Sequence, residues 1–257
     1  MAQSFTTDAL KTALAYPFQD PRWKDKFLIG SLLTLAGFVV PIIPVLPTYG
    51  YCAQIMRRII VDKGEPYLPE WDDWGKLFGD GLKLFGVGLT YLLPVLVPLF
   101  CFYGFIFVIP FLAAVSDGKV SGGESDTMNT IVAVLAVVGP FGFICLFGLI
   151  MLLGLSIGLF LPVAVGHVVA TDEFAAGFRF REIWPLFRAN LAGFLVSYII
   201  LMGGWYALSF VLGFLYLTII FCCLYPFVLA PVSLYSMIIA SVLFGEAYRD
   251  GAEIVSV

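Results

Sequence analysis

The chain has 257 residues, of which 61% are hydrophobic and only 12% charged, and its mean hydropathy is +0.99. Soluble domains carry about 25% charged residues, and apolar runs longer than about 18 residues are typical of membrane spans. The composition therefore excludes an ordinary soluble protein and predicts an all-α integral membrane protein. The net charge of −4 comes from acids in loops, so it indicates no nucleic-acid surface.

The beginning of the chain differs from the apolar sequence that follows. Its first 26 residues, MAQSFTTDALKTALAYPFQDPRWKDK, contain no continuous apolar core and no small-residue cleavage site, so they are not typical of a secretory signal. We expect residues 1–26 to form a cytoplasmic amphipathic segment. The whole chain, 1–257, is expected to fold as a single membrane domain.

Four long apolar runs follow, and the positions of Lys and Arg predict how often each run crosses the membrane. Every basic patch except Lys119 is cytoplasmic only if the first run, Phe27 to Met56, enters and returns. Pro41, Pro44 and Pro47 supply the turn, because prolines at this density break a straight helix. Helices of about 15 residues rise only about 22 Å, against an apolar core about 30 Å thick. The pair is therefore either two short spans or a re-entrant hairpin.

The later runs are divided by the same reasoning. Gly139 and Pro140 are expected to separate an exterior segment from the fourth helix, and the last run is expected to turn near Gly213. Both termini are then predicted to be cytoplasmic, in a multi-pass protein of the cell membrane. The predicted transmembrane or re-entrant helices, about six in all, are 27–44, 46–61, 82–115, 140–170, 189–212 and 216–245.

An acidic stretch rich in tryptophan, GEPYLPEWDDWGKLFGDGLKLF, interrupts the apolar sequence at residues 64–85. Trp74, Phe78 and Leu82 recur at helical spacing on one side, and the charged residues, including Asp80 and Lys83, recur on the other. A helix with these two faces is typical of the membrane interface. We therefore predict a cytoplasmic interfacial helix at 69–80.

A second stretch, DEFAAGFRFREIWPLFRANLAGF, has a similar arrangement of aromatic residues after the fourth helix. It predicts an interfacial helix at 172–184 and suggests a parallel repeat of 47–112 and 140–212. The acids of the first stretch alone also fit a solvated face or a cation site. We predict partner docking at the acids and aromatic rings of the two stretches: Glu70, Trp71, Asp72, Asp73, Trp74, Phe78, Trp184 and Phe187.

The predicted spans carry little chemistry. Asp, Glu, Lys and Arg do not occur in 84–115, 128–170 or 191–244, although proton relays, ion-coupled carriers and intramembrane aspartyl proteases need buried carboxylates. His167, the lone intramembrane ionisable residue, is interpreted as a hydrogen-bonded interfacial histidine, with a cofactor ligand or pH sensor as the alternative. Gly154 and Gly158 form a GxxxG helix-packing motif. The five cysteines lack metal or disulfide spacing and are interpreted as small buried hydrophobes, so no metal or cofactor is predicted.

Three stretches together resemble a known family: AYPFQDPRWKDKFLIGSLL at 15–33, RRIIVDKGEPYLPEWDDWGKLFGDGLK at 57–83 and LYSMIIASVLFGEAY near the end. They are similar to the bacterial and archaeal membrane proteins of domain of unknown function 4013. The resemblance implies a multi-pass plasma-membrane protein and carries over no catalytic residue.

The functional expectation is a non-enzymatic scaffold or accessory subunit of a larger membrane assembly. Its expected partners are the lipid bilayer and other membrane protein subunits. The alternative is a carrier or lipid-moving protein for an apolar or zwitterionic substrate, and an enzyme acting on lipid at the cytoplasmic face ranks third. A carrier would need a mid-membrane cavity lined by tyrosines from the set Tyr91, Tyr103, Tyr198, Tyr206 and Tyr216.

Overall fold

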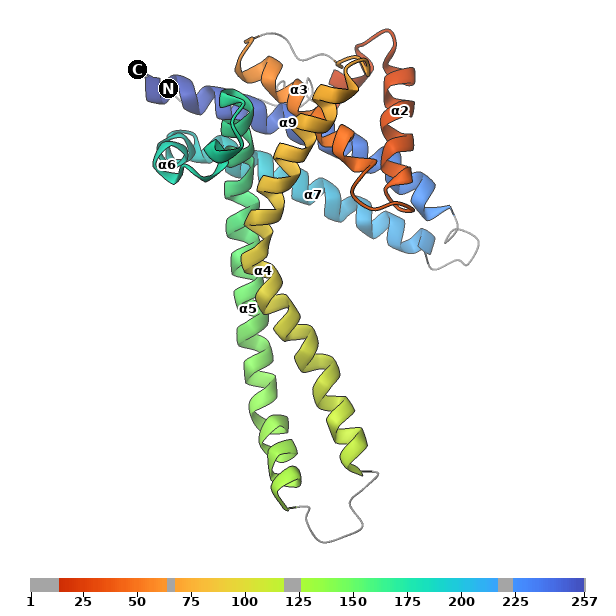
Figure 1. Cartoon of the computed structure of the whole chain (residues 1–257), viewed down its shortest axis with the longest axis vertical. Helices are drawn as coiled ribbons and strands as arrows, with labels where there is room; N and C mark the ends of the chain where they lie inside the picture. Colours follow the sequence, from red (N-terminus) through yellow and green to blue (C-terminus); the bar gives the residue numbers. More distant parts are fainter. Residues whose placement is uncertain (1–13, 64–67, 118–125, 217–223, 257) are drawn as a thin grey trace. The chain divides into compact units, whose positions relative to one another are not determined.

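The computed structural model describes residues 14–63, 68–117, 126–216 and 224–256, and within these ranges every regular element is a helix. The chain divides into two compact units, residues 1–88 with 159–257 and residues 89–158. In chain order the elements are η1 (Tyr16–Phe18), α2 (Trp23–Ala36), α3 (Val45–Ile60), α4 (Trp74–Asp117), α5 (Asp126–Thr171), η2 (Phe174–Phe178), α6 (Phe180–Ala189), α7 (Leu191–Tyr216) and α9 (Tyr225–Ser256) (Figure 1).

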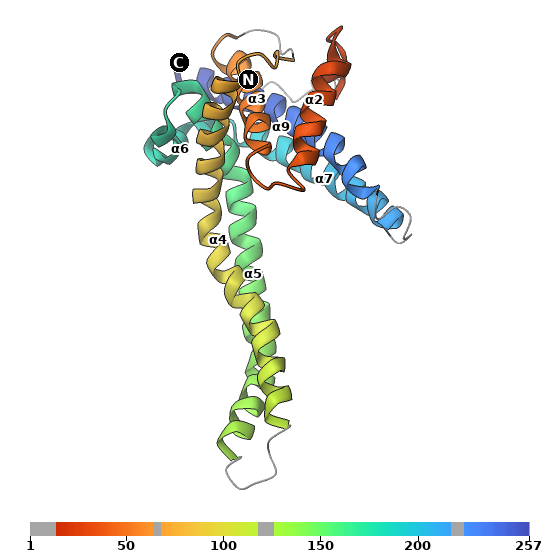
Figure 2. The ribbon, with the colours of Figure 1, turned by 45° about the vertical axis from the view of Figure 1, so that its right-hand side comes forward.

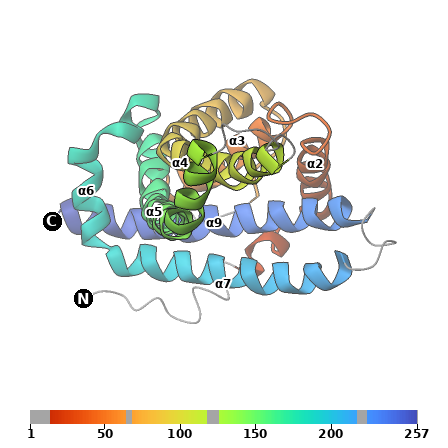
Figure 3. The same ribbon diagram turned by 90° about the horizontal axis from the view of Figure 1, so that it is seen from below.

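Helix α9 is the centre of the first unit, because α2, α3, α6 and α7 all contact it. Figure 2 shows α2 and α3 beside α9, and in Figure 3 α7 and α9 lie side by side along their length. The buried residues of α9 include small ones, such as Ala230, Gly245 and Gly251, which let other helices approach it closely. The buried core that results comprises Tyr16, Tyr51, Ile55, Ile59, Leu68, Trp71, Leu77, Leu234, Ile238, Ile239, Val242 and Leu243.

Two glycines allow α3 and the first turns of α4 to cross with their backbones in contact. A Cβ atom on Gly50 would lie 1.9 Å from the carbonyl oxygen of Leu77, and one on Gly81 would lie 1.9 Å from that of Leu46. No larger residue fits at either position without moving a helix, so these glycines set the distance between α3 and α4.

The predicted proline turn is confirmed. α2 ends at Ala36 and α3 begins at Val45, with Pro44 at its N-cap, and Ile42 between them has a φ of 76°, in the left-handed region. α2 and α3 have 14 and 16 residues and are shorter than the helices that can span a bilayer.

Four helical segments in the described part of the chain are long and apolar enough to cross a membrane. They are Trp74–Gly104, Phe141–Thr171, Leu191–Gly213 and Tyr225–Ser256. The protein is therefore an all-helical, multi-pass membrane protein.

The predicted separate interfacial helix at 69–80 is wrong, because residues 69–73 are irregular and α4 begins at Trp74. Asp73 explains the late start, since its carboxylate accepts a hydrogen bond from the backbone N–H of Lys76 at 3.0 Å. This is the geometry of a helix N-cap, for which Asp is among the preferred residues. From Trp74 the helix continues without a break into the apolar sequence.

Other predicted boundaries also move. The segment 172–184 is not one helix but two elements, η2 and α6, and α6 continues to Ala189. No break occurs at Gly139 and Pro140, because α5 is continuous from Asp126, and prolines are tolerated inside membrane helices. Gly213 lies within α7, and α9 extends past Gly245 to Ser256.

The second unit, residues 89–158, consists of the later part of α4 and the earlier part of α5. Its described side chains include outward aromatic rings, such as Phe100 and Phe141, and a contact between the rings of Phe102 and Phe143 at 4.7 Å. Cys101 and Cys145 are exposed as well, which corrects the prediction that the cysteines are buried, although Cys52 is buried. Apolar exposure of this kind is expected of a surface that faces lipid.

Candidate functional site

The acidic stretch is fixed to the first unit through Trp71. The Trp71 ring stacks on Tyr51 of α3 with centroids 4.2 Å apart, and its indole N–H donates to the carbonyl oxygen of Lys26 at 3.0 Å. The Tyr51 hydroxyl donates in turn to the carbonyl oxygen of Pro69 at 3.2 Å. Trp71 is therefore a buried anchor that joins the stretch to α2 and α3.

A cluster of charges supports the same anchor. The buried ammonium of Lys26 lies 2.6 Å from Asp20 and 2.9 Å from Glu70, and it donates to the carbonyl oxygen of Leu68 at 2.7 Å. Burial alone would lower the pKa of Lys26, but its hydrogen bonds to Asp20 and Glu70 outweigh burial and raise that pKa above 10.5. Glu70, predicted as a docking residue, is thus engaged within the protein, where Arg22 also contacts it.

The remaining residues of the predicted docking set on this stretch point outward. Asp72 is exposed, and the side chains of Trp74 and Phe78 are 42% and 38% exposed. Asp73 is exposed too, but it caps α4. Asp72, Trp74 and Phe78 are thus exposed within seven positions of one another, and the Trp74 ring lies 6.0 Å from that of the buried anchor Trp71. We call these three residues the acidic-aromatic patch.

A second charged network connects α3, α4 and the end of α5. Arg57 contacts Asp80 at 2.8 Å and Asp172 at 2.9 Å, and Lys83 contacts Asp172 at 2.8 Å. The hydrogen bond from Lys83, assisted by the positive charge of Arg57, holds the pKa of Asp172 below its usual value of 3.8. The cavity among these side chains measures about 10 Å³, room for one water molecule. The sequence placed Asp80 on an outward charged stripe, but the structure buries it.

His167 joins α5, α6 and α9. It is 7% exposed, its Nδ1 lies 2.7 Å from the hydroxyl of Tyr248, and its Nε2 lies 3.0 Å from a carboxylate oxygen of Glu182. Both ring nitrogens thus have a hydrogen-bond partner. This agrees with the interpretation of His167 as a hydrogen-bonded histidine. Within the described ranges no group of three or more His, Cys, Asp or Glu side chains could hold a metal ion.

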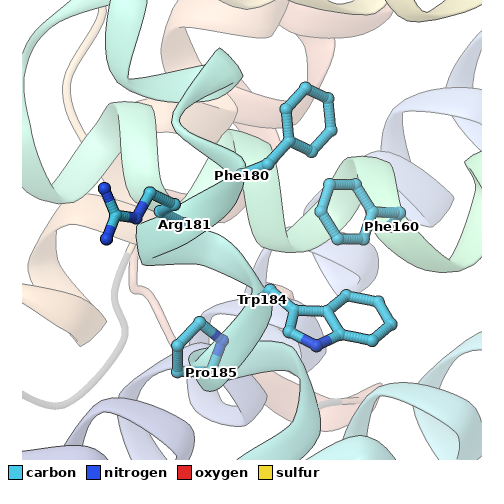
Figure 4. Close-up of a pocket in the computed structure, with 5 residues that line it drawn as sticks. All are labelled: Phe160, Phe180, Arg181, Trp184 and Pro185. Atoms are coloured by element: carbon cyan, nitrogen blue, oxygen red, sulfur yellow. The ribbon is translucent and has the colours of Figure 1, made fainter.

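A groove of about 610 Å³ lies beside α6, lined by Phe160, Phe180, Arg181, Trp184 and Pro185 (Figure 4). The rings of Phe160 and Phe180 are stacked 5.6 Å apart. The sequence singled out Trp184, which is 51% exposed, but it gave no signal for the groove, because Phe160 comes from a different helix.

The sequence also singled out Phe187 and the GxxxG motif. Phe187 is half-buried and packs its ring on Phe160 and Phe194, at 5.8 and 6.0 Å. In the second unit, a Cβ on Gly154 would meet no described atom within 4 Å, and Gly158 ends that unit. Gly50 and Gly81, by contrast, lie where a Cβ atom would meet the backbone of another helix.

Four apolar helical segments are long enough to span a membrane, and many large apolar side chains are exposed on the surface. These two features define a multi-pass membrane protein. The chain belongs to the family described as "Protein of unknown function (DUF4013)", whose model matches residues 33–221. No curated protein and no solved structure matches the chain. The matched residues include both the acidic-aromatic patch and α6.

Proposed function

We propose that the protein is a scaffold or accessory subunit of a larger assembly in the plasma membrane, docking other membrane proteins through the acidic-aromatic patch. The observation that carries this proposal is the contrast between adjacent tryptophans. Trp71 is buried and hydrogen-bonded, whereas Trp74, three residues later, is 42% exposed beside the exposed Asp72.

Such a patch suits protein recognition for two reasons. Tryptophan is enriched among the residues that dominate binding energy at interfaces, and a patch that is already rigid loses little entropy on binding. The anchor at Trp71 and the cap at Asp73 supply that rigidity on either side of Asp72. Basic residues lie around the patch, and by the positive-inside rule they favour a cytoplasmic location for it. Both termini would then lie on the same side of the membrane as the patch.

The carrier alternative has weaker support. Of the tyrosines expected to line its cavity, Tyr103 and Tyr206 are 51% and 72% exposed. The groove beside α6 and the small cavity at Arg57 are lined by none of the five tyrosines, and the side chain of Tyr216 lies outside the described residues. A scaffold needs no such cavity.

The test is purification of the tagged full-length protein from its native membranes in a mild detergent. We expect a second subunit at fixed stoichiometry, lost when Asp72→Asn and Trp74→Ala are combined. The matched control is Phe227→Ala, which removes a ring that is 61% exposed on α9, and it should keep the partner. A wild-type protein that migrates alone, or a patch variant that keeps its partner, would contradict the proposal.

A further inference from the structure

We propose that the groove beside α6 binds an anionic phospholipid, with an acyl chain along Phe160, Phe180 and Trp184 and the phosphate at Arg181. This site is separate from the acidic-aromatic patch and adds a lipid ligand to the proposed protein partner. The groove combines an apolar wall, which includes Phe160 of α5, with a cation, Arg181, that lies between Phe180 and Trp184 in α6.

The wall of the groove suits an acyl chain. Phe180 and Trp184 are 56% and 51% exposed, although both are large apolar side chains, and Phe160 stacks on Phe180. The volume of about 610 Å³ lies in the range of pockets that hold small ligands. Phe160 also lies within the candidate span Phe141–Thr171, so one side of the groove belongs to a segment that is long and apolar enough to cross a membrane. This position favours a lipid over a soluble ligand.

The charges on α6 supply the headgroup contact. Among the residues that the structure describes, Arg181 and Arg188 have no acidic partner, whereas Arg179 contacts Glu173 and lies 3.9 Å from Glu182. In Figure 4 the guanidinium of Arg181 extends away from the three aromatic rings. An amphipathic ligand matches this separation, because its phosphate and its acyl chains are at opposite ends.

α6 itself has the construction of an interfacial lipid-binding helix. Ile183 and Leu186 are buried against the protein, while Phe180, Arg181 and Trp184 face outward. A helix that is packed on one side and carries both basic and aromatic residues on the other is typical of contact with anionic membrane surfaces.

Brominated lipids test the site in the full-length protein. The protein is reconstituted in phosphatidylcholine vesicles that contain equal mole fractions of either dibrominated phosphatidylglycerol or dibrominated phosphatidylcholine. The difference between wild-type and Trp184→Phe fluorescence isolates the quenching of Trp184. We expect brominated phosphatidylglycerol to be enriched about fivefold at Trp184, as one basic residue near an anionic lipid can produce.

Arg181→Gln should make the two lipids quench Trp184 equally, whereas the control Lys76→Gln, at another exposed cation, should keep the preference. Three results would each overturn the proposal. They are equal quenching by the two lipids in the wild type, an unchanged preference in Arg181→Gln, and no quenching by either lipid because protein covers the groove. If Trp184→Phe does not fold, spin-labelled phosphatidylglycerol gives the same comparison. Its immobilised fraction should then fall in Arg181→Gln and not in Lys76→Gln.

Discussion

The rings of Tyr51 and Trp71 stack with their planes only 7° apart, although 20 positions separate the two residues in the chain. This contact turns one tryptophan of the acidic stretch into part of the core and leaves the next, Trp74, at the surface. The two residues therefore have different expected roles, which substitution separates.

Trp71→Ala should lower the free energy of unfolding by about 3–5 kcal/mol, because it removes a large buried side chain and leaves a cavity. Trp74→Ala is the matched control and should lower it by less than about 1 kcal/mol, since its ring is largely outside the core. Reversible denaturation in detergent micelles measures both. Equal destabilisation by the two substitutions would contradict the assignment of Trp71 as the anchor.

Gly79 and Gly81 in α4 are a second matched pair. Gly81→Ala places a Cβ where the carbonyl oxygen of Leu46 would be 1.9 Å away, so α3 and α4 must separate, and a loss of stability of about 1–3 kcal/mol is expected. Gly79→Ala meets nothing within 4 Å, and the higher helix propensity of alanine should raise stability by up to about 1 kcal/mol. The melting temperatures of the two variants should thus move in opposite directions.

His167 and Tyr248 should behave as a coupled pair. Each single substitution, His167→Ala or Tyr248→Phe, breaks the same 2.7 Å hydrogen bond, and the expected cost of each is about 1–3 kcal/mol. The double variant should cost less than the sum of the two, because the bond can be lost only once. Additive losses would show that the two side chains stabilise the protein independently. Unchanged stability in His167→Ala would contradict the structural role altogether.

The parts of the fold that depend on residues close together in the sequence could be predicted. Three prolines within seven residues predicted the turn between α2 and α3, and the four long apolar segments followed from their composition. The start of α4 was predicted too early. Trp71 lies three positions before Trp74, a spacing that also fits a helix, but Asp73 caps α4 and Trp71 stacks on Tyr51 ahead of it.

The charged and aromatic clusters could not be predicted, because they join distant residues. Arg57 and Asp172 are 115 positions apart, and the buried Asp80 pairs with Arg57 from another helix. The groove beside α6 likewise needs Phe160 and Trp184 to meet. Periodicity shows which face of a helix is apolar but not which helix covers it. The predicted parallel repeat and the docking residues remain predictions.

The pair formed by Lys26 and Asp20 should make stability depend on pH at both ends of the scale. Burial would raise the pKa of Asp20, but its hydrogen bonds from Lys26 and the Arg22 backbone outweigh this and lower that pKa below 3.8, whereas the pKa of Lys26 is raised above 10.5. A lowered acid pKa stabilises the fold above pH 3.8, and this contribution is lost as pH falls through the lowered value. A raised lysine pKa stabilises the fold below pH 10.5, and this contribution is lost as pH rises through the raised value.

Asp20→Asn should therefore lower the free energy of unfolding at neutral pH by about 3 kcal/mol, because it leaves the buried Lys26 with a weaker set of partners. It should also flatten the decline in stability at acid pH, although Asp172, whose pKa is lowered too, keeps part of that decline. The control is Glu253→Gln at the exposed pair with Lys63, where the loss should stay below about 1 kcal/mol. Denaturation curves recorded across the pH range measure both variants. An Asp20→Asn protein with the wild-type acid profile would show that this pair does not hold the acidic stretch in place.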